Sequence, residues 1–180
     1  GVVRQLFEPV LATATDAERA DLLAGPAAFA ERLFDELELA AAIDAGEDVG
    51  FAMLHGLYWF AANVGARKPT ILVIDDLHWA DAATLRWLTY LAPRLEGVPL
   101  RVFVASRPAE QGREPELLTQ ILTDPTALVL KPGPLTRRAA ATLAREVLAG
   151  EPDDAFIDAA CAATGGNPLF LRALLETLAQ

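Results

Sequence analysis

The sequence has little cysteine, serine or histidine, and each shortage excludes a class of chemistry. The single cysteine, Cys161, has no partner within the chain for a disulfide bond. The single serine, Ser106, lies outside any G-x-S-x-G pattern, so the nucleophile turn of a serine hydrolase is absent. The two histidines and the cysteine lie far apart along the chain and give none of the spacings of a zinc site.

Basic side chains are also scarce, since 25 Asp and Glu residues outnumber 15 Lys and Arg residues and leave a net charge of −10. Phosphate contacts need clustered cations, so this composition argues against nucleic-acid binding by the chain itself. A Mg²⁺-nucleotide is compatible with the charge, because the metal and backbone amides neutralise phosphate locally. No signal-peptide pattern is visible, and we expect an intracellular, cytoplasmic protein.

One run without charged residues, from 49 to 66, approaches the length of a membrane span. Gly50, Gly56 and Gly65 interrupt it, as do polar side chains. This composition favours a helix buried inside a folded domain, and we expect no association with a membrane.

With 53% hydrophobic and 22% charged residues, the 180-residue chain can bury a core as one domain with a small appendage. Apolar runs at 70–74, 100–105 and 127–131 are typical of strands, and helical patterns separate them. This alternation predicts a parallel sheet, and hence an α/β fold with flanking helices. Further helices are predicted at 2–11, 16–23, 27–42 and 47–63, and from 136 onward. We expect a core domain at 1–132 and a helical sub-domain at 133–180.

The most informative segment is TILVIDDLHWAD, at 70–81. Its apolar run ends abruptly in two carboxylates, Asp75 and Asp76. Open α/β sheets bind their ligands at the C-terminal ends of the strands. The layout matches a Walker B segment, in which the first Asp holds Mg²⁺ and the second handles the attacking water. Asp81 suits the N-cap of the helix that follows.

Two further candidate positions lie outside this segment. Arg107 follows the run at 100–105, at the same edge of the predicted sheet, where a guanidinium could reach a γ-phosphate. Asn167 and Pro168 follow two glycines and indicate a helix start, with Asn as N-cap and Pro at the first helical position. A corner of this kind would also suit the side of a bound nucleotide.

Together these motifs resemble STAND-type ATPases, and more narrowly the ATPase domains of large ATP-binding, LuxR-type transcription regulators and related AAA-like proteins. The stretch ILVIDDLHWADAATLRWLTYLAPRL resembles their Walker B region, and VFVASRP resembles the next strand with its sensor arginine. LKPGPLTRRAAATLA and GGNPLFLRALLETLA resemble their helical lid. The resemblance is specific over 70–108 and 164–176 and weaker elsewhere.

The resemblance implies a P-loop-NTPase-type sheet with a helical lid, which uses ATP and Mg²⁺ in bacterial signal transduction. Asp75 would ligate Mg²⁺, Asp76 would orient the attacking water, and Arg107 would sense the γ-phosphate. Asn167 and Pro168 would lie beside the nucleotide, with Pro168 touching the base. DNA would be bound only through another domain of the parent protein.

The phosphate-binding loop of that family, G-x-x-x-x-G-K-[ST], is missing, because Lys68 and Lys131 are the only lysines and neither follows a glycine-rich turn. The chain would keep strands 3, 4 and 5 of the family's sheet and lack strands 1 and 2. We therefore expect a partial sheet, no ATP hydrolysis and at best weak nucleotide binding by this chain. The uncovered hydrophobic edge favours self-association, as a dimer or higher oligomer.

Two alternatives stay open. A receiver-like phosphoacceptor domain also has an acidic pair after one strand, a Ser after a later strand and a Lys after the last. Asp75, Ser106 and Lys131 could form such a set, but only a helix lies where that fold would carry a further aspartate. The other alternative is a non-catalytic protein-interaction module, whose helices form a docking surface.

Overall fold

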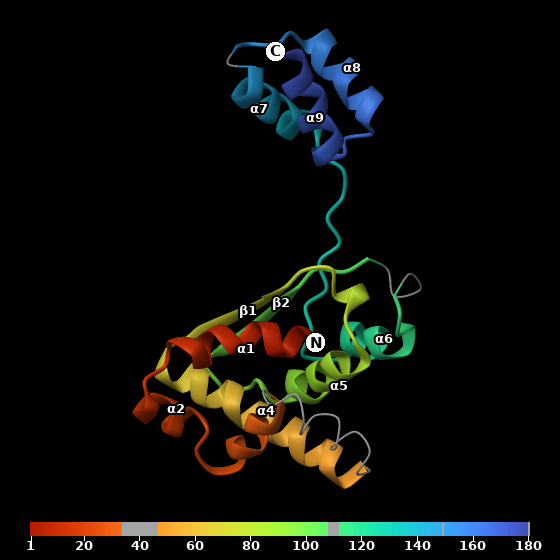
Figure 1. Cartoon of the computed structure of the whole chain (residues 1–180). Helices are drawn as coiled ribbons and strands as arrows, with labels where there is room; N and C mark the ends of the chain where they lie inside the picture. The colour runs from red at the N-terminus through yellow and green to blue at the C-terminus, as the bar shows by residue number, and fades with distance from the viewer. Residues whose placement is uncertain (34–46, 108–111, 149, 180) are drawn as a thin grey trace. The chain divides into compact units, whose positions relative to one another are not determined.

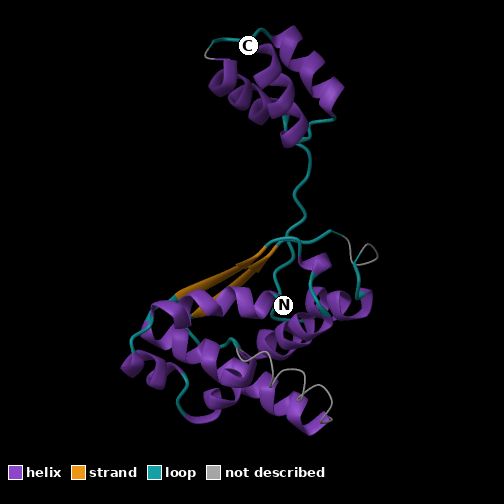
Figure 2. Cartoon of the chain, viewed as in Figure 1, coloured by secondary structure: helices purple, strands orange, loops and turns teal. Residues whose placement is uncertain are grey.

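The computed structural model describes residues 1–33, 47–107, 112–148 and 150–179. These residues form two compact units, unit 1 over Gly1–Val129 and unit 2 over Leu130–Gln180 (Figure 1). The division lies close to the expected boundary between 132 and 133. Both units are dominated by helices, and the strands belong to unit 1 (Figure 2).

Unit 1 begins with helices and continues into an alternation of strands and helices. Its elements are α1 (Val2–Thr13), α2 (Asp16–Leu22), the 3₁₀ helix η1 (Gly25–Leu33), α4 (Glu47–Arg67), β1 (Thr70–Ile74), the 3₁₀ helix η2 (Leu77–Trp79), α5 (Ala82–Leu91), the 3₁₀ helix η3 (Ala92–Arg94), β2 (Leu100–Val104) and α6 (Pro115–Thr123).

The prediction of an α-helix at 27–42 is wrong over 27–33, where η1 forms a 3₁₀ helix. The rest of the predicted helix falls outside the described residues. Helix α4 continues past its expected end at Asn63 to Arg67. Within the described ranges, no helix combines the length and apolar character needed to cross a bilayer.

The sheet of unit 1 consists of β1 and β2, which pair in parallel. Their register runs from Thr70 opposite Leu100 to Ile74 opposite Val104. This pairing confirms a mixed α/β fold with parallel strands.

The third strand expected at 127–131 is wrong, because this segment pairs with no other strand in the part of the chain that the structure describes. The amide of Ala127 instead bonds the carbonyl of Asp124 at 2.9 Å, in a turn that the Asp124 carboxylate supports through Thr126. The apolar side chains that follow remain in solvent, with Leu128 84% exposed. A strand forms only where a neighbour offers hydrogen bonds, and a run of apolar residues does not supply that neighbour.

One face of the sheet is buried and the other is open. Leu72 and Ile74 of β1 lie in the core of unit 1. Ile71 and Val73 alternate with them and are 62% and 66% exposed, and Phe103 of β2, opposite Val73, is 59% exposed. A strand with both faces apolar is typical of a sheet covered on both sides, and here only one side is covered by described residues.

The core of unit 1 centres on aromatic rings from three helices. Phe7 of α1 is fully buried and meets Phe60 of α4 edge to face, with ring centroids 5.1 Å apart. It meets Trp87 of α5 in the same way at 5.7 Å. Edge-to-face pairs place the positive ring edge on the negative ring face, so they fix the angle between the helices as well as burying area.

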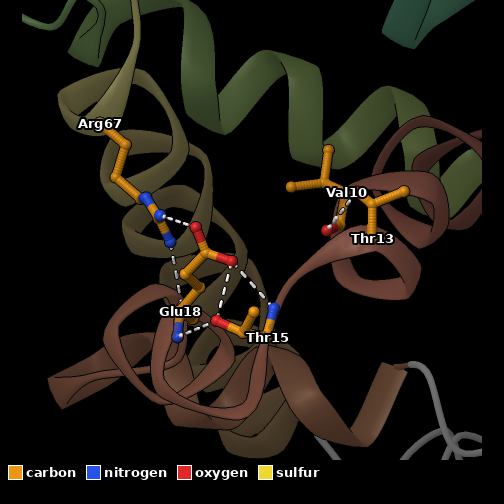
Figure 3. Close-up of polar contacts among 5 residues, drawn as sticks. All are labelled: Val10, Thr13, Thr15, Glu18 and Arg67. Atoms are coloured by element: carbon orange, nitrogen blue, oxygen red, sulfur yellow. Dashed lines mark hydrogen bonds and ion pairs between the residues drawn. The ribbon is translucent and has the colours of Figure 1, made fainter.

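Polar contacts at the start of α2 reach the end of α4 (Figure 3). Thr15 caps α2 in a capping box, in which its backbone N–H donates to the Glu18 carboxylate at 2.9 Å. Arg67, in the last turn of α4, donates to the same carboxylate. Nearby, the Thr13 hydroxyl donates to the Val10 carbonyl at 3.3 Å at the end of α1. The Arg67 contact therefore ties two segments that lie far apart in the sequence.

Unit 2 is a three-helix arrangement of α7 (Arg137–Leu148), α8 (Asp154–Thr164) and α9 (Pro168–Leu178). Small and aliphatic residues form its core: Ala140, Ala144, Ile157, Ala160, Leu171 and Leu175. Arg137 joins α7 to α8 through ion pairs with Asp154 at 2.9 Å and Asp158 at 2.6 Å.

Candidate functional site

The candidate site lies where β1 and β2 end. Asp75 and Asp76 follow β1, and Ser106 and Arg107 follow β2; we call these four residues the acidic edge. Because the two strands are parallel neighbours, their C-terminal ends lie side by side. Hydrogen bonds continue past the strands, from Ala105 N–H to the Ile74 carbonyl at 2.9 Å and from Leu77 N–H to the Ala105 carbonyl at 2.8 Å.

Asp76 adopts a left-handed backbone conformation, with φ 52° and ψ 41°, and is the one non-glycine residue with positive φ in the described part of the chain. Asp and Asn tolerate this region better than other side chains. The Asp75 carboxylate supports the turn, since its Oδ1 accepts the Asp76 N–H at 2.8 Å. The chain thus leaves the sheet abruptly, with both carboxylates exposed to solvent.

The carboxylates fit a metal that arrives with a ligand better than a resident one. In the described ranges, no three His, Cys, Asp or Glu side chains gather closely enough to hold a metal ion. Mg²⁺ is commonly held by one or two carboxylates together with substrate phosphates and water. Oδ1 of Asp75 accepts the Asp76 amide, so Oδ2 is the oxygen that could hold such a metal ion.

Arg107 is exposed, and its guanidinium makes no hydrogen bond or ion pair to any residue that the structure describes. Its backbone is held, because the Arg107 N–H donates to Nδ1 of His78 at 3.4 Å. The structure therefore places Arg107 at the same edge as Asp75 and Asp76 without pairing it with either carboxylate. A cation that no acid satisfies can contact an anionic ligand.

His78 has no obvious partner in the sequence, where it could at most help to hold the loop, and its burial at this site is not predicted. Its side chain is only 1% exposed, and its Nδ1 lies 3.8 Å from Oδ1 of Asp76. The signal in the sequence is weak, because a histidine two positions after an acidic pair gives no indication that it will be buried. Its neighbour Trp79 is 55% exposed, with the Arg113 guanidinium 5.5 Å from its ring centroid.

Asp81 has the capping role that the sequence predicts. Its carboxylate accepts hydrogen bonds from the Thr84 backbone at 2.9 Å and the Thr84 hydroxyl at 3.0 Å. Partial burial alone would raise the pKa of Asp81, but these bonds, with one from the Val2 amide, outweigh it and lower the pKa below its usual value. The cap fixes the start of α5 and therefore the length of the loop that carries Asp76.

Asn167 and Pro168 lie in unit 2, at the start of α9. The Asn167 side-chain oxygen accepts from the amides of Leu169 at 2.9 Å and Phe170 at 3.3 Å. An open groove of about 450 Å³ borders this corner, and its lining includes Leu135, Pro168 and Arg172. Pro168 thus lines a concave surface, whereas the oxygen of Asn167 is occupied by capping.

The phosphoacceptor alternative requires Lys131 beside Asp75 and Ser106. Lys131 lies on no strand and belongs to unit 2. The geometry of the described residues therefore gives this alternative no support.

We compared the chain with protein-family models, with curated proteins and with solved structures, and none of the three comparisons gave a match.

Proposed function

We propose that this chain is the Walker B and lid part of a STAND-type, AAA-like ATP-binding module that lacks its own phosphate-binding loop. The observation that carries the proposal is the acidic edge, where Asp75 and Asp76 follow one parallel strand and Arg107 follows its neighbour. In this role Asp75 ligates Mg²⁺, Asp76 orients water, and Arg107 contacts the γ-phosphate.

The electrostatics of the edge support a metal-bound anion. Two adjacent carboxylates repel a bare phosphate, but they attract a divalent cation that carries one. Arg107, whose guanidinium pairs with no described residue, then supplies the positive charge that the terminal phosphate needs. The backbone amides of a phosphate loop supply much of the binding energy in P-loop proteins, so we expect weak binding and no hydrolysis.

Calorimetry with Mg-ATP on the 180-residue chain tests this proposal. We expect weak binding that Asp75→Asn abolishes, because it removes the metal ligand, and that Arg107→Ala weakens to the level of Mg-ADP, because it removes the contact with the terminal phosphate. Asp21→Asn, at an exposed position on α2, is the matched control and leaves binding unchanged. Absence of binding at millimolar nucleotide, or equal binding by all variants, overturns the assignment. Hydrolysis of ATP by the chain would contradict the expectation that it is catalytically inactive.

The parent protein that we propose is a bacterial signalling ATPase, a LuxR-type transcription regulator in the cytoplasm. The net charge of −10 supports a separate domain for DNA binding, since this chain repels a phosphate backbone. Titration of duplex DNA into the chain at low salt is the direct measurement, and we expect no complex. Specific DNA binding by this chain would contradict the proposal that another domain of the parent protein binds DNA.

We also propose that the open sheet face mediates self-association. Ile71, Val73 and Phe103 form an apolar surface that water solvates poorly, and the sheet has unpaired edges among the described residues. Sedimentation should detect a dimer that Val73→Ser combined with Phe103→Ser dissociates. Leu169→Ser, at a residue 70% exposed in unit 2, serves as the control. A monomer at all concentrations contradicts the proposal.

A further inference from the structure

His78 is the most deeply buried polar side chain at the acidic edge, and the proposed function gives it no role. It lies in η2, between the left-handed Asp76 and the helix α5, and its ring is 1% exposed. Histidine is costly to bury unless its nitrogens are satisfied, so its presence here calls for a physical reason.

His78 accepts hydrogen bonds from two other segments of unit 1. Its ring nitrogen Nδ1 accepts the N–H of Arg107, which follows β2. Its backbone carbonyl accepts the N–H of Arg113 at 3.2 Å, just before α6. The loop with Asp75 and Asp76 is thus tied through one residue to the segments on both sides of 108–111.

The tautomer of His78 follows from these contacts. Because Nδ1 accepts a hydrogen bond from a backbone amide, the neutral ring carries its proton on Nε2. That Nε2 is buried and meets no acceptor among the residues that the structure describes. The Asp76 carboxylate is not a hydrogen-bond partner of the ring, since its Oδ1 lies 3.8 Å from Nδ1, which is too long for a hydrogen bond. Among the described residues, the ring therefore makes one hydrogen bond, which it accepts from the Arg107 N–H.

We infer that His78 is a positioning residue that holds the main chain of Arg107 at the acidic edge. Arg107 follows the last strand residue closely and its side chain is otherwise unattached to described residues, so the position of its backbone sets where the guanidinium can reach. A fixed backbone reduces the freedom that Arg107 loses when it contacts a ligand. That the guanidinium contacts the terminal phosphate of a Mg²⁺-nucleotide rests on the function proposed above.

Amide hydrogen exchange on the full chain tests the contact without any nucleotide. His78→Phe keeps a ring in the buried position but removes the acceptor, and exchange at the Arg107 amide should accelerate about tenfold. His78→Asn places an amide oxygen where Nδ1 lies and should keep the protection near that of the wild type. The Arg113 amide is the internal control, since its partner is a backbone carbonyl that both variants retain.

Unchanged exchange at Arg107 in His78→Phe overturns the inference. If the Phe variant instead loses protection at Leu77 and Arg113 as well, the whole edge has loosened and the Asn variant decides. Protection restored by Asn supports the hydrogen bond, and protection lost in both variants overturns it.

Nucleotide discrimination provides the second measurement. We expect His78→Phe to reduce the preference for Mg-ATP over Mg-ADP as Arg107→Ala does, with affinity for Mg-ADP unchanged, and His78→Asn to preserve it. A wild-type chain that binds neither nucleotide refutes the proposed function, yet the exchange result still decides the contact. A preference retained by His78→Phe shows that the contact does not position the guanidinium.

Discussion

Trp59 donates its indole N–H to Nε2 of His55, one turn earlier on α4, at 3.0 Å. An indole nitrogen can only donate, so Nε2 of His55 must be unprotonated and the neutral ring carries its proton on Nδ1. That nitrogen lies 2.9 Å from the Tyr90 hydroxyl of α5 and donates to it. The relationship links two helices through a chain of aromatic side chains.

His55 and His78, the two histidines of the chain, should therefore show opposite tautomers. His55 has its proton on Nδ1, and His78 has its proton on Nε2, because each ring uses its other nitrogen as an acceptor. Long-range ¹H–¹⁵N spectra distinguish the two forms of a neutral imidazole, and His55→Gln assigns the signals. Two rings in the same tautomer would disprove one of the two hydrogen bonds.

Gly56→Ala should destabilise unit 1, although alanine normally favours a helix by about 1 kcal/mol over glycine. A Cβ at position 56 would lie 2.8 Å from Cβ of Phe29 and 2.9 Å from the Ala30 backbone nitrogen, so α4 and η1 would have to separate. Gly50→Ala is the matched control on the same helix, because no described atom lies within 4 Å of its Cβ. Denaturant unfolding should show a loss for the first variant and no loss for the second.

Stability should fall with acidity through the Glu18 carboxylate. Hydrogen bonds from Thr15, followed by the contact with Arg67, lower the pKa of Glu18 from 4.5 to about 2. A carboxylate with a depressed pKa stabilises the fold fully above its unfolded pKa, and this contribution disappears as the pH falls from 4.5 through 2. The free energy of unfolding at about pH 6, above both pKa values, should therefore exceed that of Glu18→Gln, and the difference should shrink over this window. Glu96→Gln, at an exposed turn, controls for net charge.

The cap at Asn167 can be separated from any contact with a nucleotide. Asn167→Ala should cost about 1 kcal/mol and accelerate exchange at the Leu169 and Phe170 amides, because their acceptor is lost. Asn167→Asp retains an acceptor and places negative charge at a helix N-terminus, so protection should persist. If the aspartate variant leaves both amides unprotected, the side chain at this position does not act as the cap.

Elements with a local cause could be predicted from the sequence. The strand at 70–74 needs β2 as its partner, but the turn that ends it is local, because Asp75 supports that turn with its own side chain. The starts of α5 and α9 follow from Asp81 and Asn167, whose acceptors reach amides within three residues. Such signals lie within a single turn of the chain, so they do not depend on contacts with distant segments.

Features that depend on distant partners could not be predicted. The apolar residues at 127–131 have strand propensity, but no strand in the described residues offers them a ladder. The ring of His78 accepts a hydrogen bond from Arg107, 29 positions away, and no pattern around His78 specifies that contact. Which face of the sheet is covered also could not be predicted. Leu72 and Val73 are both apolar, yet Leu72 is buried and Val73 is exposed.

The left-handed backbone of Asp76 has a consequence for protein engineering. Glycine adopts that conformation at no steric cost, so replacing the aspartate with glycine relieves local strain while deleting a carboxylate. Selection of libraries for heat tolerance alone will favour glycine there, and the most stable variants will have lost the carboxylate to which the proposed function assigns the attacking water. A screen that also scores ligand response is needed to keep it.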